Sequence, residues 1–268
     1  MNLRRRIGLL LLLSITVLPA CAGVPTTQPV TGGDDQPFLL HLPGIGGHRW
    51  PDEMLTQGLL AGGIDAEIHI YDWTGEDEGL NALTNSARHE KQAKIVADLL
   101  VGVARSQPRR PIIVTCHSGG AGIAAWAIEQ LPEDVNVRQW LMVAPALSPE
   151  FDLAPALQRV NGSAYAFLSS IDPINGWGTR NFGTIDRLNV DAAGKVGFEV
   201  PTDGNRATAY RKLRQIPYDS AWVRAGNAGD HVGGMMKPFA RRVIAPLLLT
   251  GELPKIEPAQ RATTRPAA

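Results

Sequence analysis

Between residues 37 and 250 the chain alternates short apolar runs typical of buried strands with longer segments of helical periodicity. The predicted strands are Phe38 to Leu42, Ala66 to Tyr71, Pro111 to Thr115, Gln139 to Val143, Ala164 to Ser169 and Ala221 to Ala225. The predicted helices are about Met54 to Ala61, Asn85 to Ser106, Ala121 to Gln130, Ala154 to Val160 and Lys237 to Leu248. This alternation predicts parallel βαβ units, and therefore an α/β fold with a mostly parallel central sheet and helices on both of its faces.

A serine stands at the junction of one predicted strand and the helix that follows it. The segment reads Cys116-His117-Ser118-Gly119-Gly120, with small residues two positions before and two positions after the serine. A tight strand-to-helix turn strains the backbone at its apex and needs small flanking residues. The hydroxyl of Ser118 is then accessible and lies above a helix N-terminus, whose free N–H groups favour negative charge. These features indicate a nucleophile.

Two other interpretations of this turn remain open. The glycines can serve only for close packing between strand and helix. Alternatively, Cys116 is the nucleophile, which places Val114 and Ser118 at the flanking positions. A β-branched valine fits a strained turn poorly, so Cys116 is better explained as a small buried residue.

The pentapeptide resembles the nucleophile elbow of the α/β-hydrolase superfamily, with Cys116 where that family usually has glycine. The resemblance implies an α/β-hydrolase fold and a catalytic triad in the chain order serine, acid, histidine. Of the six histidines, only His231 follows Ser118, and it lies in a glycine-rich loop. We therefore expect His231 to be the general base.

The acid of the triad is expected just after the strand that follows the elbow unit. Asp172 lies there, directly after the predicted strand Ala164 to Ser169. It would orient His231 and stabilise its charged form. Asp186, Asp191 and Asp203 also lie between the serine and the histidine, so they remain candidates.

The oxyanion hole needs two backbone donors. Gly119, directly after the serine, is expected to supply one N–H group. The loop Pro43-Gly44-Ile45-Gly46-Gly47-His48 resembles the His-Gly-x-Gly-Gly loops of α/β-hydrolases, with Pro43 in place of histidine, and by that alignment Ile45 supplies the second. A phosphate-binding loop is disfavoured because neither a following Lys-Ser/Thr pair nor a G-x-G-x-x-G spacing occurs here.

All four key positions lie just after predicted strands. Ligand sites of parallel sheets lie at the carboxyl ends of the strands. Ser118, Ile45, Asp172 and His231 are therefore expected to meet at one edge of the sheet.

The N-terminus has the pattern of a targeting segment. Three arginines at residues 4–6 precede the apolar run Ile7 to Val17, and Leu18-Pro19-Ala20-Cys21 resembles a bacterial lipobox. The resemblance implies lipidation of Cys21 and an extracytoplasmic lipoprotein anchored to a membrane. Ala22, rather than aspartate, favours the outer membrane, with the protein on its periplasmic face. A plain secretory signal is the nearest alternative. A transmembrane anchor is disfavoured because the apolar run is short, and twin-arginine export is disfavoured because the basic start is an ordinary one.

Composition divides the chain into segments. Residues 1–20 are the predicted signal peptide, 21–36 a flexible tether, 37–250 one α/β-hydrolase domain and 251–268 a disordered tail. The interval Val143 to Ala164 is too short for a large cap domain. The longer stretch Pro173 to Pro217 contains a predicted hairpin at Ile185 to Val200, and it either borders the acyl pocket or covers a sheet edge.

Charge and cysteine content exclude several function classes. The formal net charge is zero and no basic run longer than two residues occurs after the signal, so nucleic-acid binding has no support. Cys/His spacings typical of metal sites are absent, so neither a metal nor another cofactor is expected. We predict a serine hydrolase that cleaves a small-molecule ester, thioester or lipid substrate. The alternatives are an acyltransferase with the same triad, a catalytically silent binding or scaffold lipoprotein, and a peptidase.

Overall fold

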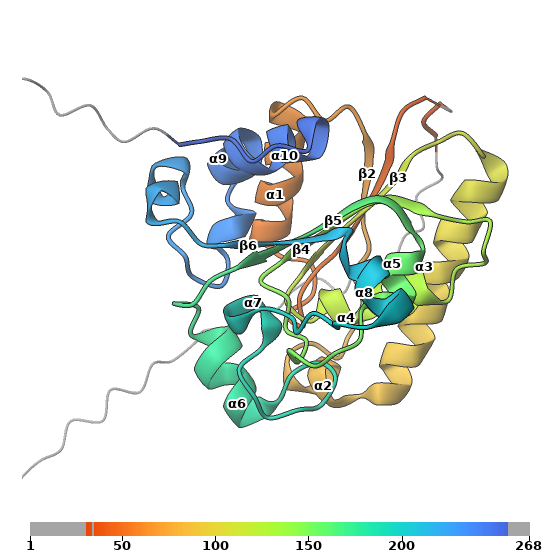
Figure 1. The fold of residues 1–268 in the computed structure, drawn as a ribbon. Coiled ribbons are helices and arrows are strands. Elements are labelled where there is room, and N and C mark those ends of the chain that lie inside the picture. The colour runs from red at the N-terminus through yellow and green to blue at the C-terminus, as the bar shows by residue number, and fades with distance from the viewer. Residues whose placement is uncertain (1–30, 34, 257–268) are drawn as a thin grey trace, which may run out of the picture.

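A six-stranded sheet in the order β2-β1-β3-β4-β5-β6 forms the centre of the molecule, and all neighbouring strands are parallel. The structure, a computed structural model, describes residues 31–33 and 35–256 (Figure 1). The strands are β1 (Phe38–Leu42), β2 (Glu67–Ile70), β3 (Ile112–His117), β4 (Val137–Val143), β5 (Val160–Leu168) and β6 (Leu213–Pro217). This architecture confirms the predicted fold class.

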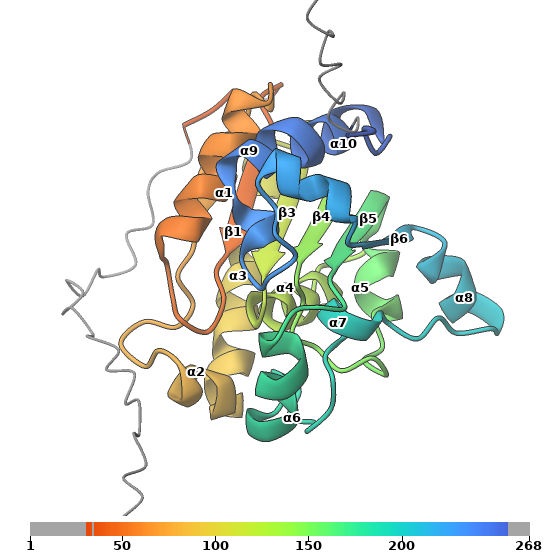
Figure 2. The same cartoon turned by 90° about the vertical axis from the view of Figure 1, so that its left-hand side faces the viewer.

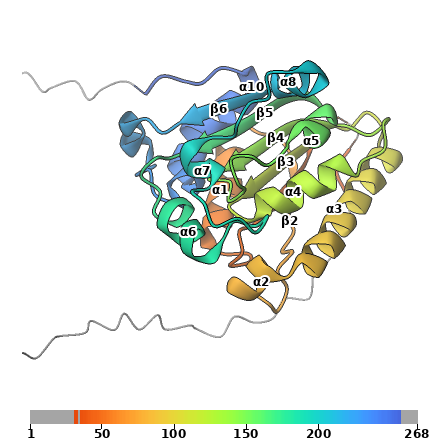
Figure 3. The same ribbon diagram turned by 60° about the horizontal axis from the view of Figure 1, so that its bottom comes forward.

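Helices cover both faces of the sheet (Figures 1 and 3). The helices are α1 (Trp50–Ala61), α2 (Leu80–Thr84), α3 (Ser86–Ser106), α4 (Gly120–Glu129), α5 (Ala154–Gln158), α6 (Thr179–Phe182), α7 (Ala193–Val196), α8 (Gly204–Tyr210), α9 (Lys237–Phe239) and α10 (Ala245–Thr250). Helices α3, α4, α5 and α8 lie on one face, and α1, α9 and α10 lie on the other. A π-helical turn, Ala240–Ile244, joins α9 to α10.

Alternation along the strands builds a separate apolar cluster on each face. Phe38, Leu40 and Leu42 of β1 pack in the cluster with α3 and α4, whereas Leu39 packs in the cluster with α1 and α10. The period of two follows from the pleat, because successive side chains of a strand point to opposite faces. Both faces are apolar because helices bury both, as expected for a parallel sheet.

One predicted strand is wrong. The segment predicted at Ala221 to Ala225 is a 3₁₀ helix, Ser220–Ala225, because the Asp219 carboxylate accepts the Ala221 N–H at its start. Gly226 ends it in the left-handed region at φ 92°. The sixth strand is Leu213–Pro217, at the sheet edge, where a final proline costs no ladder hydrogen bond.

The predicted hairpin is also wrong. The segment after α6 contains the short helix α7 and a turn in which Arg187 has φ 76°. Its backbone bonds instead to the loop after β4, since Ile185 N–H donates to Ala146 O and Ala193 N–H to Leu147 O. In a hairpin, these two N–H groups would have donated to carbonyls of the same segment.

The predicted signal peptide, Cys21, most of the predicted tether and most of the predicted C-terminal tail lie outside the described residues. At the beginning of the described chain, the Thr31 and Gly32 N–H groups donate to the Glu67 carboxylate, and Gln107 donates to Gly32 O at 2.5 Å. The chain therefore enters the domain at the amino ends of the strands. Within the described part, none of the helices has the length and hydropathy to cross a bilayer.

Candidate active site

Ser118 lies at the apex of a sharp turn between β3 and α4. Its φ is 51°, in the left-handed region that few residues other than glycine adopt. A Cβ atom on Gly120 would overlap the carbonyl oxygens of Leu42 and Pro43, so the turn approaches the end of β1 too closely for any larger residue. This strain and close packing are the features expected of a nucleophile elbow.

His231 connects the serine to a carboxylate. Its Nε2 lies 2.9 Å from the Ser118 Oγ, and its Nδ1 lies 2.7 Å from the Asp172 Oδ2. When Nδ1 carries the proton it donates to the carboxylate, and the Nε2 lone pair then faces the serine hydroxyl. The structure therefore brings together three residues that are separated by 59 and 113 positions along the sequence.

Asp172 is buried and held by its own loop. Its Oδ1 accepts the backbone N–H groups of Ile174 at 2.8 Å and Asn175 at 3.1 Å, which leaves Oδ2 for His231. Burial alone would raise the pKa of this carboxyl, but the hydrogen bond and charge of His231 and the two N–H donors outweigh it, so its pKa lies below the ordinary value. Asp172 is therefore ionised at neutral pH.

The other candidate acids have different partners. The Asp186 carboxylate accepts both the N–H and the hydroxyl of Ser148, at 2.9 and 2.5 Å. Asp191 pairs with Arg180 at 2.8 Å and with Lys195 at 3.2 Å. Asp203 is exposed and precedes α8.

The Gly44–Ile45 loop, which follows β1, lies against the serine. The ideal Cβ position on Gly44 is 3.7 Å from the Ser118 Oγ, and that on Gly119 is 3.7 Å from the Ile45 nitrogen. Across residues 31–33 and 35–256, neither the Gly119 nor the Ile45 N–H has a hydrogen-bond acceptor. Two backbone donors next to the serine are thus free to bind a developing oxyanion.

Two bonds hold this loop in place. The indole of Trp73 donates to Pro43 O at 2.7 Å, and the Gly79 N–H donates to Ile45 O, also at 2.7 Å. The carbonyl of Ile45 therefore points away from the site while its N–H group remains available.

His117 is a site residue that the sequence analysis did not identify. Its Nε2 donates to the backbone carbonyl of His231 at 3.0 Å, and the two imidazole rings lie 4.8 Å apart between centroids. Burial, with a contribution from the nearby His231, lowers the pKa of His117 to about 4. A neutral His117 therefore supports the loop that carries the general base. Its only sequence signal is its position beside Ser118.

Cys116 does not have the properties of a nucleophile. It is fully buried on the α3/α4 face of the sheet, away from His231, and burial raises the pKa of its thiol to about 12. A thiol that stays protonated is a poor nucleophile. The geometry therefore favours Ser118 over the alternative register.

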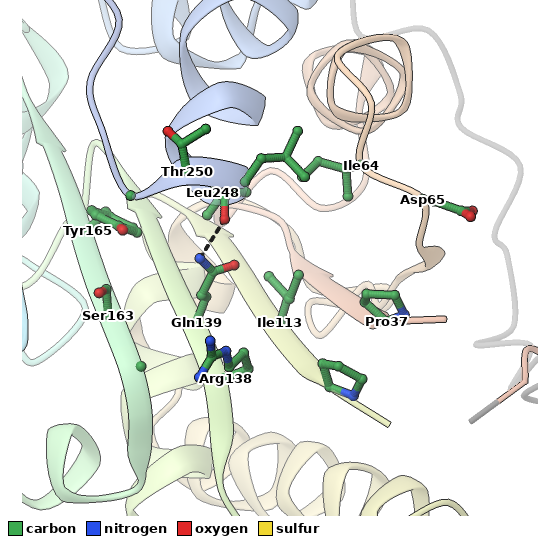
Figure 4. A pocket seen from close by; sticks show the side chains of 14 residues that line it. Pro37, Ile64, Asp65, Ile113, Arg138, Gln139, Ser163, Tyr165, Leu248 and Thr250 are labelled. Atoms are coloured by element: carbon green, nitrogen blue, oxygen red, sulfur yellow. Dashed lines mark hydrogen bonds between the residues drawn. The ribbon is translucent and has the colours of Figure 1, made fainter. Parts of the chain in front are cut away.

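The cavity of about 420 Å³ in Figure 4 is not part of this site. It lies at the amino ends of the strands, where Pro37, Ile113, Arg138 and Tyr165 line it and Gln139 donates to Leu248 O at 2.8 Å. Ser118 follows the carboxyl end of β3, at the opposite edge of the sheet. Figure 2 shows α4, α6 and α7 at that edge. In the described part of the chain, no cluster of three or more His, Cys, Asp or Glu side chains is arranged to hold a metal ion.

Comparisons with known proteins concern most of the chain. The sequence model of a family described as "Alpha/beta hydrolase family" matches residues 39–267. The comparison with curated proteins gave no match. Similar solved structures include the esterase Pf2001 of Pyrococcus furiosus, which is 13% identical over 80% of this chain and 83% of that chain, with a TM-score of 0.48. Two others are carboxyl esterase 2 of Tuber melanosporum (11% identity, 81% and 76% coverage, TM-score 0.46) and Est1E of Butyrivibrio proteoclasticus (14% identity, 84% and 90% coverage, TM-score 0.45).

Proposed function

This chain belongs to the alpha/beta hydrolase family, and on that premise we propose that it is a serine hydrolase of carboxylic ester or thioester bonds. The observation that carries the proposal is the continuous line of hydrogen bonds from Asp172 through His231 to Ser118. Two unpaired N–H groups beside the serine support it further.

In the proposed reaction, Ser118 Oγ attacks the carbonyl carbon of the ester while His231 Nε2 takes its proton. Asp172 stabilises the imidazolium that forms. The carbonyl oxygen becomes an oxyanion and accepts hydrogen bonds from the N–H groups of Gly119 and Ile45. Each such donor typically contributes a factor on the order of 10²–10³ in rate.

Breakdown of this intermediate uses the same groups in reverse roles. His231 gives its proton to the leaving alcohol or thiol, and Ser118 retains the acyl group as an ester. His231 then takes a proton from water, whose oxygen attacks the acyl carbon. The bond between the acyl carbon and Ser118 Oγ breaks, His231 returns the proton to Oγ, and the acid is released. Neither step requires a cofactor.

Ester turnover by matched variants tests this proposal. Ser118→Ala removes the attacking atom, so kcat/KM for p-nitrophenyl acetate should fall at least about 10⁴-fold. Ser163→Ala is the control, because Ser163 lines the cavity at the other edge of the sheet and should keep wild-type turnover. Retention of turnover by Ser118→Ala would contradict the proposal.

We also infer that the protein is a lipoprotein anchored through Cys21 and located outside the cytoplasm. The basic residues 4–6, the apolar run that follows and the Leu18-Pro19-Ala20-Cys21 sequence support this inference. The proposed substrate is a small ester or a lipid that is accessible in that compartment.

A further inference from the structure

Ile185 is a fully buried side chain on the segment between α6 and α7. Its N–H donates to Ala146 O at 2.9 Å, and the N–H of Ala146 in turn donates to Ser118 O at 3.1 Å. The two bonds Asp186 accepts from Ser148 fix the turn that follows. Ile185 is therefore held in a defined place relative to the serine.

This side chain lies against the beginning of α4, beside the proposed oxyanion donors. An ideal Cβ on Gly119 would lie 3.6 Å from the Ile185 Cδ1 and 2.7 Å from the Ile45 Cγ2. An ideal Cβ on Gly122, one turn along the helix, would lie 2.6 Å from the Ile185 Cγ2. Ile185 and Ile45 thus occupy the space next to Gly119.

On its other side, Ile185 lines a cavity of about 710 Å³ between α3 and α4. Aromatic rings form part of its wall, where Trp126 stacks on His89 at 5.6 Å and meets Phe151 edge-on at 6.1 Å, and most of the remaining lining residues are charged or polar. The Trp126 ring also approaches the ideal Cβ of Gly122 to 3.0 Å, so it directly adjoins Ile185. Ile185 therefore lies between the proposed catalytic groups and this cavity. The helices α6 and α7, which flank its segment, lie near α4 in Figure 3.

His231 and Ile185 lie on opposite faces of the sheet, which indicates the part of the substrate that would contact Ile185. His231 lies among Tyr218, Trp222 and Gly234, on the face of the sheet covered by α1 and α10. Ile185 packs in the cluster on the opposite face, with α3 and α4. In the proposed reaction His231 protonates the leaving group, so we expect that group on the His231 side and the acyl group on the Ile185 side.

We propose that Ile185 is a specificity-determining residue that limits the acyl group to short chains by closing the site off from the cavity between α3 and α4. This inference rests on the proposed ester hydrolysis and adds its substrate class, esters of short-chain acids. When the side chain is shortened, the cavity becomes an acyl site that takes longer or aromatic acyl groups. A difference of one methylene group in an apolar pocket typically changes discrimination about 10–200-fold.

Hydrolysis of a p-nitrophenyl ester series from acetate to decanoate, with benzoate added, tests this assignment. For the wild type, kcat/KM should fall at least about tenfold from butanoate to octanoate. Ile185→Ala should raise the octanoate-to-butanoate ratio at least about tenfold, and Ile185→Val, which preserves the packing better, should raise it by a smaller factor. The control is Ile128→Ala, a fully buried isoleucine of the same cluster that does not line the cavity, and it should keep the wild-type ratio.

Two results overturn the inference. One is an unchanged chain-length ratio in both Ile185 variants while ester hydrolysis persists. The other is an equal change in Ile128→Ala, which would indicate a general loosening of the core. Loss of the proposed function would be recognised separately, as wild-type protein that hydrolyses no ester in the series.

Discussion

At the scale of single residues, the candidate site depends on hydrogen bonds between side chains from distant loops. Asp172 has one oxygen bound by two backbone N–H groups and the other directed to His231. The carboxylate therefore fixes both the position and the tautomer of the imidazole. Asparagine at this position would keep the size but present an N–H group to Nδ1, which favours the wrong tautomer.

Asp172→Asn is therefore expected to lower kcat by about 10³- to 10⁴-fold without unfolding the protein. Turnover of p-nitrophenyl acetate and thermal unfolding measure the two effects. Asp203→Asn is the control, because Asp203 is exposed before α8. Near-wild-type turnover in Asp172→Asn would mean that another group orients His231.

His117 should make stability depend on pH. Its folded pKa of about 4 lies below the ordinary value of 6.5, so between these pH values the unfolded chain binds more protons. The free energy of unfolding should therefore decrease as the pH falls from 6.5 to 4, by on the order of 3 kcal/mol. The lowered pKa of Asp172 acts in a more acidic window, since its contribution is lost as the pH falls from around its ordinary pKa of 3.8 through the lower folded value.

Urea unfolding of His117→Gln between pH 4 and 7 measures this contribution. The share of the decrease that comes from His117 should disappear in the variant, because glutamine does not titrate, whereas His89, whose pKa is also lowered by burial, keeps its own share. An equally steep decrease in His117→Gln would contradict the assignment.

At the scale of elements, the elbow depends on how closely α4 approaches β1. Gly120 has its Cα against the carbonyls of Leu42 and Pro43, which leaves no space for a Cβ atom. The same contact brings the Gly44–Ile45 loop beside Ser118. Packing and site geometry are therefore coupled at this one glycine.

Gly120→Ala should destabilise the protein by about 3 kcal/mol and reduce ester turnover, because the overlap must displace β1 or α4. Chemical denaturation and turnover measurements check both effects. Gly102→Ala is the matched control, since a Cβ there meets no atom within 4 Å in the middle of α3. The control should stabilise the protein by roughly 0.5–1 kcal/mol. Equal stability of the two variants would contradict the packing account.

Elements with a strong local pattern were predictable, and those fixed by distant contacts were not. The strands β1, β3 and β4 follow apolar runs, and β1 matches its predicted bounds, whereas β2 alternates polar and apolar residues. The edge strand β6 has a mixed sequence, Leu213–Pro217, and its position depends on pairing with β5. The 3₁₀ helix Ser220–Ala225 was mistaken for a strand because its apolar content carries no period over six residues.

The candidate site shows the same division. Position after strands was enough to select Ser118, Asp172, Gly119 and Ile45, and order along the chain was enough to select His231, although the strand predicted before it is a 3₁₀ helix. The structure brings these residues together, and their catalytic roles stay predictions. His117 and Ile185 were not predicted as site residues. Their contacts, with the His231 carbonyl and with Gly119 and Gly122, are tertiary and leave no local pattern.

At the scale of the whole molecule, the two edges of the sheet have different roles. The candidate site lies at the carboxyl ends of the strands, whereas Thr31 and Gly32 bind Glu67 at the amino ends. A chain anchored through Cys21 would therefore enter the domain at the edge opposite the site. The proposed anchor then leaves the site accessible to substrate in solution.

Lipidation predicts a specific mature N-terminus. Mass spectrometry of the protein purified from membranes should find Cys21 as the first residue, carrying acyl chains. Cys21→Ser should move the protein from the membrane fraction to the soluble fraction, because the acyl chains supply about 0.8 kcal/mol per buried CH₂. An unmodified start at Cys21 or Ala22 would show that the segment is a plain secretory signal.

The most direct test is to map the residue labelled by a fluorophosphonate probe. The probe reacts covalently with a serine only where a base and oxyanion donors activate it. We predict that the wild type is labelled on Ser118, that Ser163→Ala is labelled equally, and that Ser118→Ala is not labelled. Label on another residue, or a folded wild-type protein that does not react, would contradict the proposed catalytic site.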